Sequence, residues 1–507
     1  MSEERLQKAV ALTITSGYQL DKEAFDFLKL LSQKRDPVKL MAEAVKRLEG
    51  VSEKTLFINR GFLEETAGAV FPKEEEVKLH PQPIEARKAF HAYAKDIDAD
   101  IKVIEDPTDK ISGSGALEDY LEYFQDRFRK LERILRKRID ARGATSISEA
   151  LKAPNNSNVK IIGMITEKRE SKQKLILRIE DLEASASLLV SSSASHEILD
   201  KARRLLLDQV VCVSATKVRN NLLIADDFIW PDVPQKKPQK ASMPVYAALI
   251  SDLHVGSKMF MAEAFNRFIL WLNGKFGNSH LRNMASHVKY VVIAGDLVDG
   301  IGIYPGQIEE LAITDVYEQY RAVSKFIAQI PDYIELIIIP GNHDASRKAL
   351  PQPALPQEYA EPLYESRKMY SLGDPCTVRL HQVELLLYHG RSLDDLVASV
   401  PNMSFHTPEK AMRLLLQSRH LAPIYGERTL IAPEKQDFMV IENPPDIFHA
   451  GHVHVVGRDT YRGISVVNSG AWQHQTEYQK KMGLTPTPGI APIVDLQTLQ
   501  VKTINFT

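Results

Sequence analysis

The alternation of apolar and polar positions predicts helices in the first third of the chain. The first fifty residues hold two amphipathic runs with helical spacing, as at Ala24, Leu28 and Leu31. A charged, poorly periodic stretch follows, which is typical of a linker. Beyond it, apolar residues from Leu117 to Leu135 form one continuous helical face. We therefore expect, in chain order, a helical docking domain (1–50), a charged flexible linker (51–115) and a connecting helix (116–150).

Between about 159 and 230 the pattern changes to short strands. Three strand-like runs are followed by the helical segment HEILDKARRLLL and two more strand-like runs. The order β-β-β-α-β-β is that of the OB-fold, a five-stranded barrel that often binds oligonucleotides, which we expect over 151–235. Basic residues such as Lys168 and Lys217 lie around its expected hairpins, but aromatic residues for stacking on bases are nearly absent. A DNA-contacting role and a scaffold role therefore both stay open.

After residue 244 one pattern occurs five times: an apolar run of strand length, then polar groups at its carboxyl end. The five instances are VYAALI-SDLH, YVVIA-GDLVD, LIIIP-GNHD, VELLLY-HG and DIFHA-GHVH. Buried strands with helices between them predict an α/β domain, over 236–507, whose functional groups gather at the strand ends. The groups are Asp252, His254, Asp296, Asn342, His343, His389, His452 and His454.

These residue types suit a metal centre. A single histidine at a strand end is usually structural, but eight such groups at five strand ends are not expected by chance. Asp-x-His and His-x-His would place both side chains on one face of an extended segment, because side chains alternate along a strand. Imidazole and oxygen ligands without thiolates favour manganese, iron or zinc.

Composition narrows the class of protein. Hydrophobic residues make up 44% of the 507 and charged residues 26%, a globular balance. No run is long and apolar enough to span a bilayer and no secretory signal is visible, so we expect a cytoplasmic protein without a membrane partner. Two cysteines exclude a disulfide framework or a thiolate cluster. With 64 basic and 66 acidic residues, DNA binding must be local or shared with a partner.

The motifs also carry a family resemblance. In order and spacing, DLH, GDLVD, GNHD, HG and GHVH resemble the calcineurin-like metallophosphoesterase superfamily. The segments YHGRSLDD and VNSGAWQHQTEYQKKMGLTPTPG, and the layout of the whole chain, resemble the small subunits of archaeal family-D DNA polymerases. The resemblance implies a multidomain chain whose phosphoesterase domain is a β-sandwich flanked by helices.

The resemblance also implies a role for each candidate residue. Asp252, His254 and His454 would hold one divalent ion, and Asn342, His389 and His452 the other. Asp296 would bridge the two ions, His343 would meet the scissile phosphate, and Asp299 would orient a ligand. Manganese is the expected ion, with iron, zinc and magnesium as alternatives.

The function implied is that of a 3′–5′ exonuclease that proofreads for a polymerase and scaffolds it. The expected partners are the large catalytic polymerase subunit, in a heterodimer or larger assembly, and DNA, with a sliding clamp as a further candidate. Two alternatives stay open: a scaffold without catalysis, and an independent phosphoesterase acting on small esters. The presence of all seven expected ligands favours an active nuclease.

Overall fold

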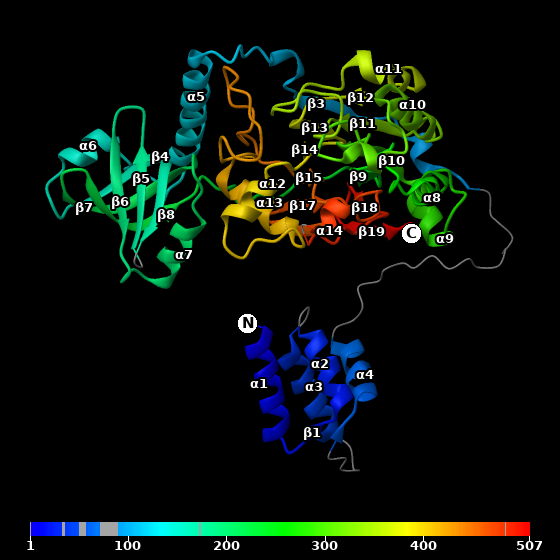
Figure 1. Cartoon of the computed structure of the whole chain (residues 1–507), viewed down its shortest axis with the longest axis horizontal. Coiled ribbons are helices and arrows are strands. Elements are labelled where there is room, and N and C mark those ends of the chain that lie inside the picture. Colours follow the sequence, from blue (N-terminus) through cyan, green and yellow to red (C-terminus); the bar gives the residue numbers. More distant parts are fainter. Residues whose placement is uncertain (1, 33–35, 50–56, 71–89, 172–173, 482) are drawn as a thin grey trace. The chain divides into compact units, whose positions relative to one another are not determined.

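The computed structural model describes residues 2–32, 36–49, 57–70, 90–171, 174–481 and 483–507, and the chain forms two compact units, Met1–Val77 and Lys78–Thr507 (Figure 1). The first unit is helical, and Leu28, Met41 and Leu63 are buried in its core. Its elements are α1 (Ser2–Thr15), β1 (Gln19–Leu20), α2 (Lys22–Leu31), α3 (Pro37–Glu49), β2 (Phe57–Ile58) and α4 (Arg60–Val70).

The expected linker at 51–115 contains regular structure, so that expectation needs correction. Strand β2 pairs with β1, and α4 packs on α3 within the first unit. Further along lie η1 (Tyr93–Asp96), β3 (Ile101–Glu105) and η2 (Thr108–Lys110). Strand β3 pairs only with β13, at a sheet edge, and therefore carries charged side chains that look like linker sequence. Residues 50–56 and 71–89 of this region lie outside the described residues.

Strands β4 to β8 close into a five-stranded barrel in the order β4-β5-β6-β8-β7, with α7 between β6 and β7. The predicted sequence of elements is thus confirmed. Two of the basic side chains noted above serve the barrel itself, because Lys168 donates to backbone carbonyls of Arg203 and Leu205, and Lys217 to that of Ala153. The elements are β4 (Asn158–Ser171), β5 (Lys174–Glu180), β6 (Ser185–Val190), α7 (His196–Arg204), β7 (Val210–Arg219) and β8 (Leu222–Ile229).

Two six-stranded sheets form the rest of the second unit. The first has the order β12 (Tyr370–Ser371), β11 (Glu335–Ile339), β10 (Val288–Ala294), β9 (Tyr246–Ile250), β18 (Ile490–Asp495) and β19 (Val501–Asn505). The second has the order β16 (Gly457–Tyr461), β17 (Ile464–Asn468), β15 (Ile447–Ala450), β14 (Val383–Leu387), β13 (Cys376–Leu380) and β3. One apolar core holds Val292 and Ile337 of the first sheet together with Leu385 and Val467 of the second. The sheets therefore pack face to face.

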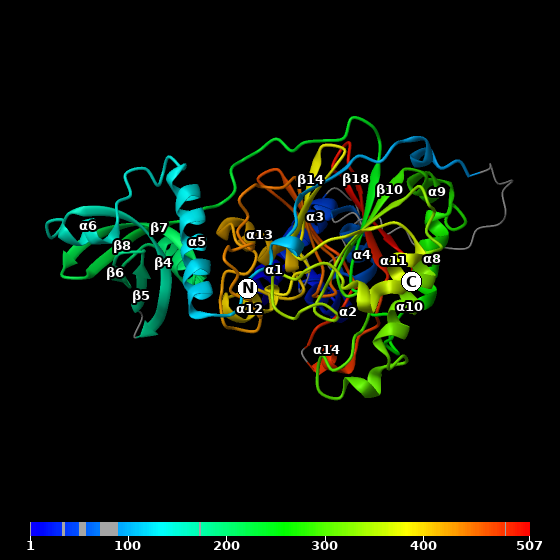
Figure 2. The ribbon, with the colours of Figure 1, turned by 90° about the horizontal axis from the view of Figure 1, so that it is seen from above.

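Helices surround these sheets, as Figure 2 shows from above. Helix α13 contacts β16 and β17, while α10 packs on α11 and α8 on α9. No helix among the described residues is both long and apolar enough to cross a membrane. The helices of the second unit not yet given are α5 (Leu117–Arg136), α6 (Ile147–Lys152), α8 (Ala262–Leu272), α9 (Ser279–Ser286), α10 (Val316–Ile327), α11 (Gln357–Ser366), α12 (Leu393–Ser399), α13 (Pro408–Ser418) and α14 (Glu477–Lys481), with η3 (Gln307–Glu310).

Strand direction brings the strand-end motifs together. Strands β9, β10 and β11 are mutually parallel, and so are β14, β15 and β17. The carboxyl ends of parallel strands meet at one edge of a sheet, which is where ligands bind in α/β folds. Two such edges, one from each sheet, supply the loops described below.

Helix α5 joins the barrel to the sandwich through a buried ion pair. The Arg127 guanidinium donates to Asp437 Oδ2 at 2.7 Å, and both side chains are fully buried. Arg127 also donates to Tyr123 Oη and the Pro423 carbonyl. Burial alone would raise the pKa of Asp437, but the neighbouring His420 and Arg127 hold that pKa well below its usual range. The pair is hydrogen-bonded on both sides, as a buried charge requires.

We predict that Arg127→Met lowers the free energy of unfolding of this unit by about 3–5 kcal/mol, because it leaves the Asp437 carboxylate buried without its partner. The exposed Arg129 on the same helix provides the matched control, and Arg129→Met should change stability by less than about 0.5 kcal/mol. Urea denaturation followed by circular dichroism measures both variants. Equal stability of the two would contradict the assigned role of the pair.

Candidate metal centre

The structure brings the eight predicted side chains to one place, the loops after five strands. Asp252 and His254 follow β9, Asp296 follows β10, Asn342 and His343 follow β11, His389 follows β14, and His452 and His454 follow β15. Most of them line a cleft with a cavity volume of about 280 Å³. Asp252 and His389 are buried against its floor, each within reach of the residues that line it.

The local geometry differs from that predicted. Asp252, His254, Asp296, His452 and His454 all have positive φ, between 52° and 71°, so the Asp-x-His and His-x-His pairs do not lie on extended strands. The chain turns through left-handed residues immediately after each strand, and this turn directs both side chains of a pair inward. Such residues cost about 1–3 kcal/mol each and persist where the surrounding structure fixes them, typically at functional sites.

Two glycines permit the close approach of these loops. A Cβ on Gly341 would lie 2.2 Å from Asp296 Oδ1, and one on Gly451 would lie 2.6 Å from Asp252 Oδ2. Any larger residue would displace the carboxylate. At these positions glycine is therefore required by contact between loops of different strands.

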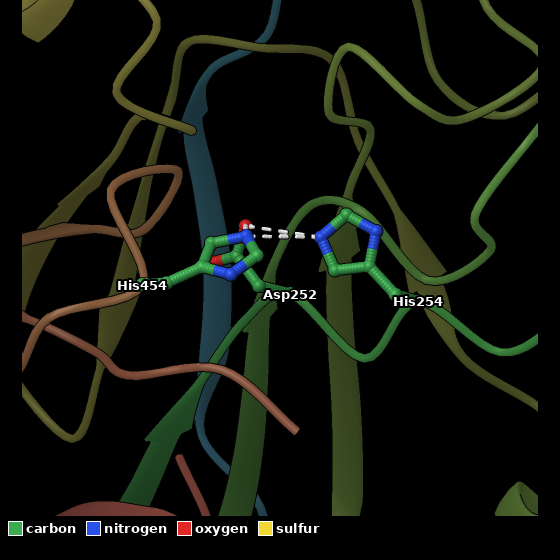
Figure 3. A group of neighbouring side chains, drawn as sticks. All are labelled: Asp252, His254 and His454. Atoms are coloured by element: carbon green, nitrogen blue, oxygen red, sulfur yellow. Dashed lines mark hydrogen bonds and ion pairs between the residues drawn. The ribbon is translucent and has the colours of Figure 1, made fainter. Parts of the chain in front are cut away.

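Asp252, His254 and His454 form the first group of potential ligands (Figure 3). The two imidazoles face each other, with 3.0 Å between their Nε2 atoms. Asp252 Oδ1 lies 3.4 Å from His454 Nε2 and 3.9 Å from His254 Nε2. All three side chains are buried.

Asp296 lies between this group and a second one. Its Oδ2 atom is 3.7 Å from His254 Nε2 and 3.4 Å from His389 Nε2. His389 Nε2 is also 3.0 Å from Asn342 Oδ1. Asp252, Asp296 and His389 have ligand atoms close enough to share one ion.

The other two histidines lie at the edge of the cluster. The His452 ring is 5.2 Å from that of His389, and its Nε2 pairs with Asp394 Oδ2 at 3.3 Å. The His343 ring stands edge-on to His254 at 4.6 Å. His343 Nδ1 is 2.7 Å from the Asp299 carbonyl and the His343 amide donates to Asp296 Oδ1, so this ring is fixed beside the cluster.

The hydrogen bonds behind the histidines test whether the residues fit a metal ion. His254 Nδ1 bonds Asp299 Oδ1 at 3.0 Å, and His389 Nδ1 bonds the Ala294 carbonyl at 2.8 Å. Because those partners accept, each Nδ1 carries the proton and each Nε2 lone pair is directed at other acceptors. Acceptors that converge in this way, with ring orientation set from behind, are the arrangement a divalent cation requires. The residues fit.

The pKa values show the same negative potential. Burial alone would lower the pKa of both His254 and His389, but hydrogen bonds and the charges of the aspartates raise them to about 9 and about 10. Burial likewise opposes the charge of Asp296, yet His389 and His343 hold its pKa well below the usual range. Burial dominates at His343 and lowers its pKa to about 4. The cluster therefore favours positive charge at its centre.

Several residues of the site were not predicted from the sequence. Gln479 contacts His454 Nδ1 at 2.8 Å, Gln473 donates to Asp299, and Asp394 pairs with His452. Asp344 accepts from the amides of Leu297 and Gly341 and so ties the loops after β10 and β11. Asp344 and Asp394 stand inside motifs noted above, GNHD and YHGRSLDD, and only that position could have drawn attention to them.

Comparison with known proteins identifies the family. Residues 247–455 match the DNA polymerase alpha/epsilon B-subunit family, which defines the class as a polymerase B-subunit. Relatives called DNA polymerase II small subunit include those of Archaeoglobus fulgidus (42% identity, covering 81% of each chain), Methanothermobacter thermautotrophicus (37%, covering 92% of this chain and 93% of that one) and Halobacterium salinarum (35%, covering 97% of each). The chain belongs to this family of archaeal DNA polymerase II small subunits, as its motifs predicted.

We predict that manganese stabilises the protein. At about 100 times its dissociation constant, an ion that binds only the folded chain adds about 2.7 kcal/mol to the free energy of unfolding. Asp296→Asn should lose most of this gain, because the side chain contacts both ligand groups. His196→Ala, an exposed histidine of the barrel, is the control and should keep it. Equal stabilisation of both variants, measured by thermal denaturation, would place the ion elsewhere.

Proposed function

We propose that this chain is the proofreading small subunit of archaeal DNA polymerase D, a 3′–5′ exonuclease that uses two divalent metal ions. The observation that carries the proposal is the convergence of all the predicted ligands in one cleft, in a member of a DNA polymerase subunit family. Asp252, His254 and His454 would hold one ion, Asn342, His389 and His452 the other, with Asp296 between them. The short distances from Asp296 to His254 and His389 support its bridging role.

Bound divalent ions would supply an activated water and neutralise charge on the phosphate. The protein's own groups have separate tasks. Asp299 holds His254 through Nδ1, as expected for a carboxylate that orients a ligand. The buried, hydrogen-bonded surroundings keep the ligand atoms in place before substrate arrives, so little reorganisation is needed during reaction.

His343 is placed to act on the phosphate. Its Nδ1 is engaged by the Asp299 carbonyl, which leaves Nε2 as the ring nitrogen available to a ligand. The residue lines the cleft beside Asp296 without belonging to the paired donors above. An imidazole at this point can pass a proton to the departing sugar oxygen or stabilise charge on the phosphate.

The remaining domains fit an accessory subunit. We propose that the barrel over 151–235, with the OB-fold, and the phosphoesterase domain over 236–507, of the calcineurin-like class, together bind the large catalytic subunit. The barrel's internal use of Lys168 and Lys217 leaves fewer basic groups for DNA, so DNA binding would be shared within the complex. The helical first unit would dock a further partner, for which a sliding clamp is a candidate.

Two other functions make different predictions. A non-catalytic scaffold needs no ligand set, whereas all seven ligand positions are filled here by metal-binding residue types. An independent phosphoesterase would prefer a small aryl phosphate to DNA. The deciding experiment assays end-labelled single-stranded DNA and a small aryl phosphate with the full chain, alone and with the large subunit, in manganese or magnesium. Release of mononucleotides from the 3′ end supports the proposal, and absence of DNA hydrolysis in every condition contradicts it.

We predict that Asp296→Ala removes nuclease activity more completely than Asn342→Ala. The reason is that Asp296 lies between both ligand groups, whereas Asn342 contacts only His389 among the expected ligands. Initial rates on labelled DNA at saturating manganese measure the difference. An Asp296→Ala variant that digests DNA at a near-normal rate would refute the bridging role.

His343→Ala should lower kcat by about 10²–10⁴, the usual contribution of a general acid, while metal content stays at the wild-type level. Elemental analysis of the purified variant supplies the control. Loss of one ion from the variant would show instead that His343 is a ligand.

A further inference from the structure

The cleft has an aromatic wall that the mechanism above does not use. Tyr304 and Tyr478 stack on each other there, with ring centroids 5.8 Å apart and planes 24° apart. They come from segments far apart in the chain, the loop before η3 and helix α14 (Figure 2). Tyr478 is 55% exposed, and the Tyr304 ring lies 6.4 Å from the ring of His343. The aromatic pair thus extends outward from the residue assigned to the phosphate.

Both rings are anchored to residues that hold the histidine ligands. Gln307, in the turn after Tyr304, donates to Asp299 Oδ2 at 3.1 Å, and the Tyr304 hydroxyl bonds Glu310 at 2.9 Å. On the other segment, Gln479 follows Tyr478 directly and contacts His454 Nδ1. The positions of the two rings are therefore fixed relative to the candidate metal centre.

Basic groups also line this cleft. Arg391 and Arg428 contribute guanidinium groups, and Arg391 is held by a hydrogen bond to the Lys348 carbonyl. A pocket with a metal centre, guanidinium groups and an exposed aromatic face matches the parts of a nucleic acid: the scissile phosphate, a neighbouring phosphate and a base. Phosphate chemistry alone would not require the aromatic face.

We propose that Tyr478, backed by Tyr304, is a stacking platform for the base of the terminal nucleotide, so that the site selects single-stranded DNA ends. This inference rests on the proposed nuclease function. A base on the platform must leave the duplex stack, and unstacking is least costly for a mismatched or unpaired end. The same contact would give a proofreading nuclease its preference for misincorporated nucleotides.

The first test uses kinetics of the full chain with manganese on labelled single-stranded DNA that ends in a normal or an abasic nucleotide. Loss of one stacked base is worth about 1–3 kcal/mol. Tyr478→Ala should therefore raise KM about tenfold on the normal end, with kcat within about twofold, and should leave the abasic end unchanged. Tyr478→Phe should restore the wild-type KM, because the ring suffices for stacking.

The matched control is a second tyrosine pair outside the cleft lining. Tyr317 stacks on Tyr359 with centroids 5.4 Å apart and is 41% exposed. Tyr317→Ala removes the same chemical group from the surface and should change neither substrate's KM. A Tyr478→Ala variant that behaves like Tyr317→Ala on both substrates would overturn the platform while leaving the nuclease function intact.

A binding readout separates the two proposals. DNA with 2-aminopurine at its end, joined by a phosphorothioate that slows hydrolysis, should lose fluorescence on binding the wild type, and Tyr478→Ala should abolish this quenching. Quenching at the penultimate position alone would contradict the assignment of the terminal base. Quenching by a wild type that hydrolyses no DNA would support the platform and refute the nuclease.

Discussion

The second unit depends on one electrostatic constraint, the burial of several carboxylates next to imidazoles at the meeting edge of two sheets. Asp252, Asp296 and Asp299 are each about 1% exposed or less, and a buried charge without a partner costs several kcal/mol. The structure meets this cost with histidines whose Nε2 atoms converge on the aspartates and whose Nδ1 atoms are held from behind. Cations that bind there would complete the charge balance, and this links folding to the proposed chemistry.

That constraint explains why the supporting structure is rigid. Five candidate ligands adopt positive φ, and the loops pass so closely that a Cβ on Gly341 would displace Asp296. Strain of this kind is retained only where packing fixes it. The common core of the two sheets supplies that packing, since strands β9, β10, β14 and β15 all contribute side chains to it or to its neighbour.

Much of the site could be predicted from the sequence, because its ligands follow buried strands in a repeating pattern and each pair is local. The same locality predicted the order of elements in the barrel. What could not be predicted depends on contacts between distant segments. Gln479 and Asp394 act on His454 and His452 through such contacts, and the Tyr304–Tyr478 pair joins segments more than 170 residues apart. Strand β3 escaped prediction for a different reason, since an edge strand with exposed charges resembles a linker.

The central claim is that strand ends of both sheets build one site for two ions. Anomalous diffraction at the manganese edge, from crystals of the full chain grown with manganese, tests it most directly. The account predicts two peaks in the cleft, one beside Asp252 and His454 and one beside Asn342 and His389, with the Asp296 carboxylate between them. A single peak, or peaks outside the cleft, would contradict it.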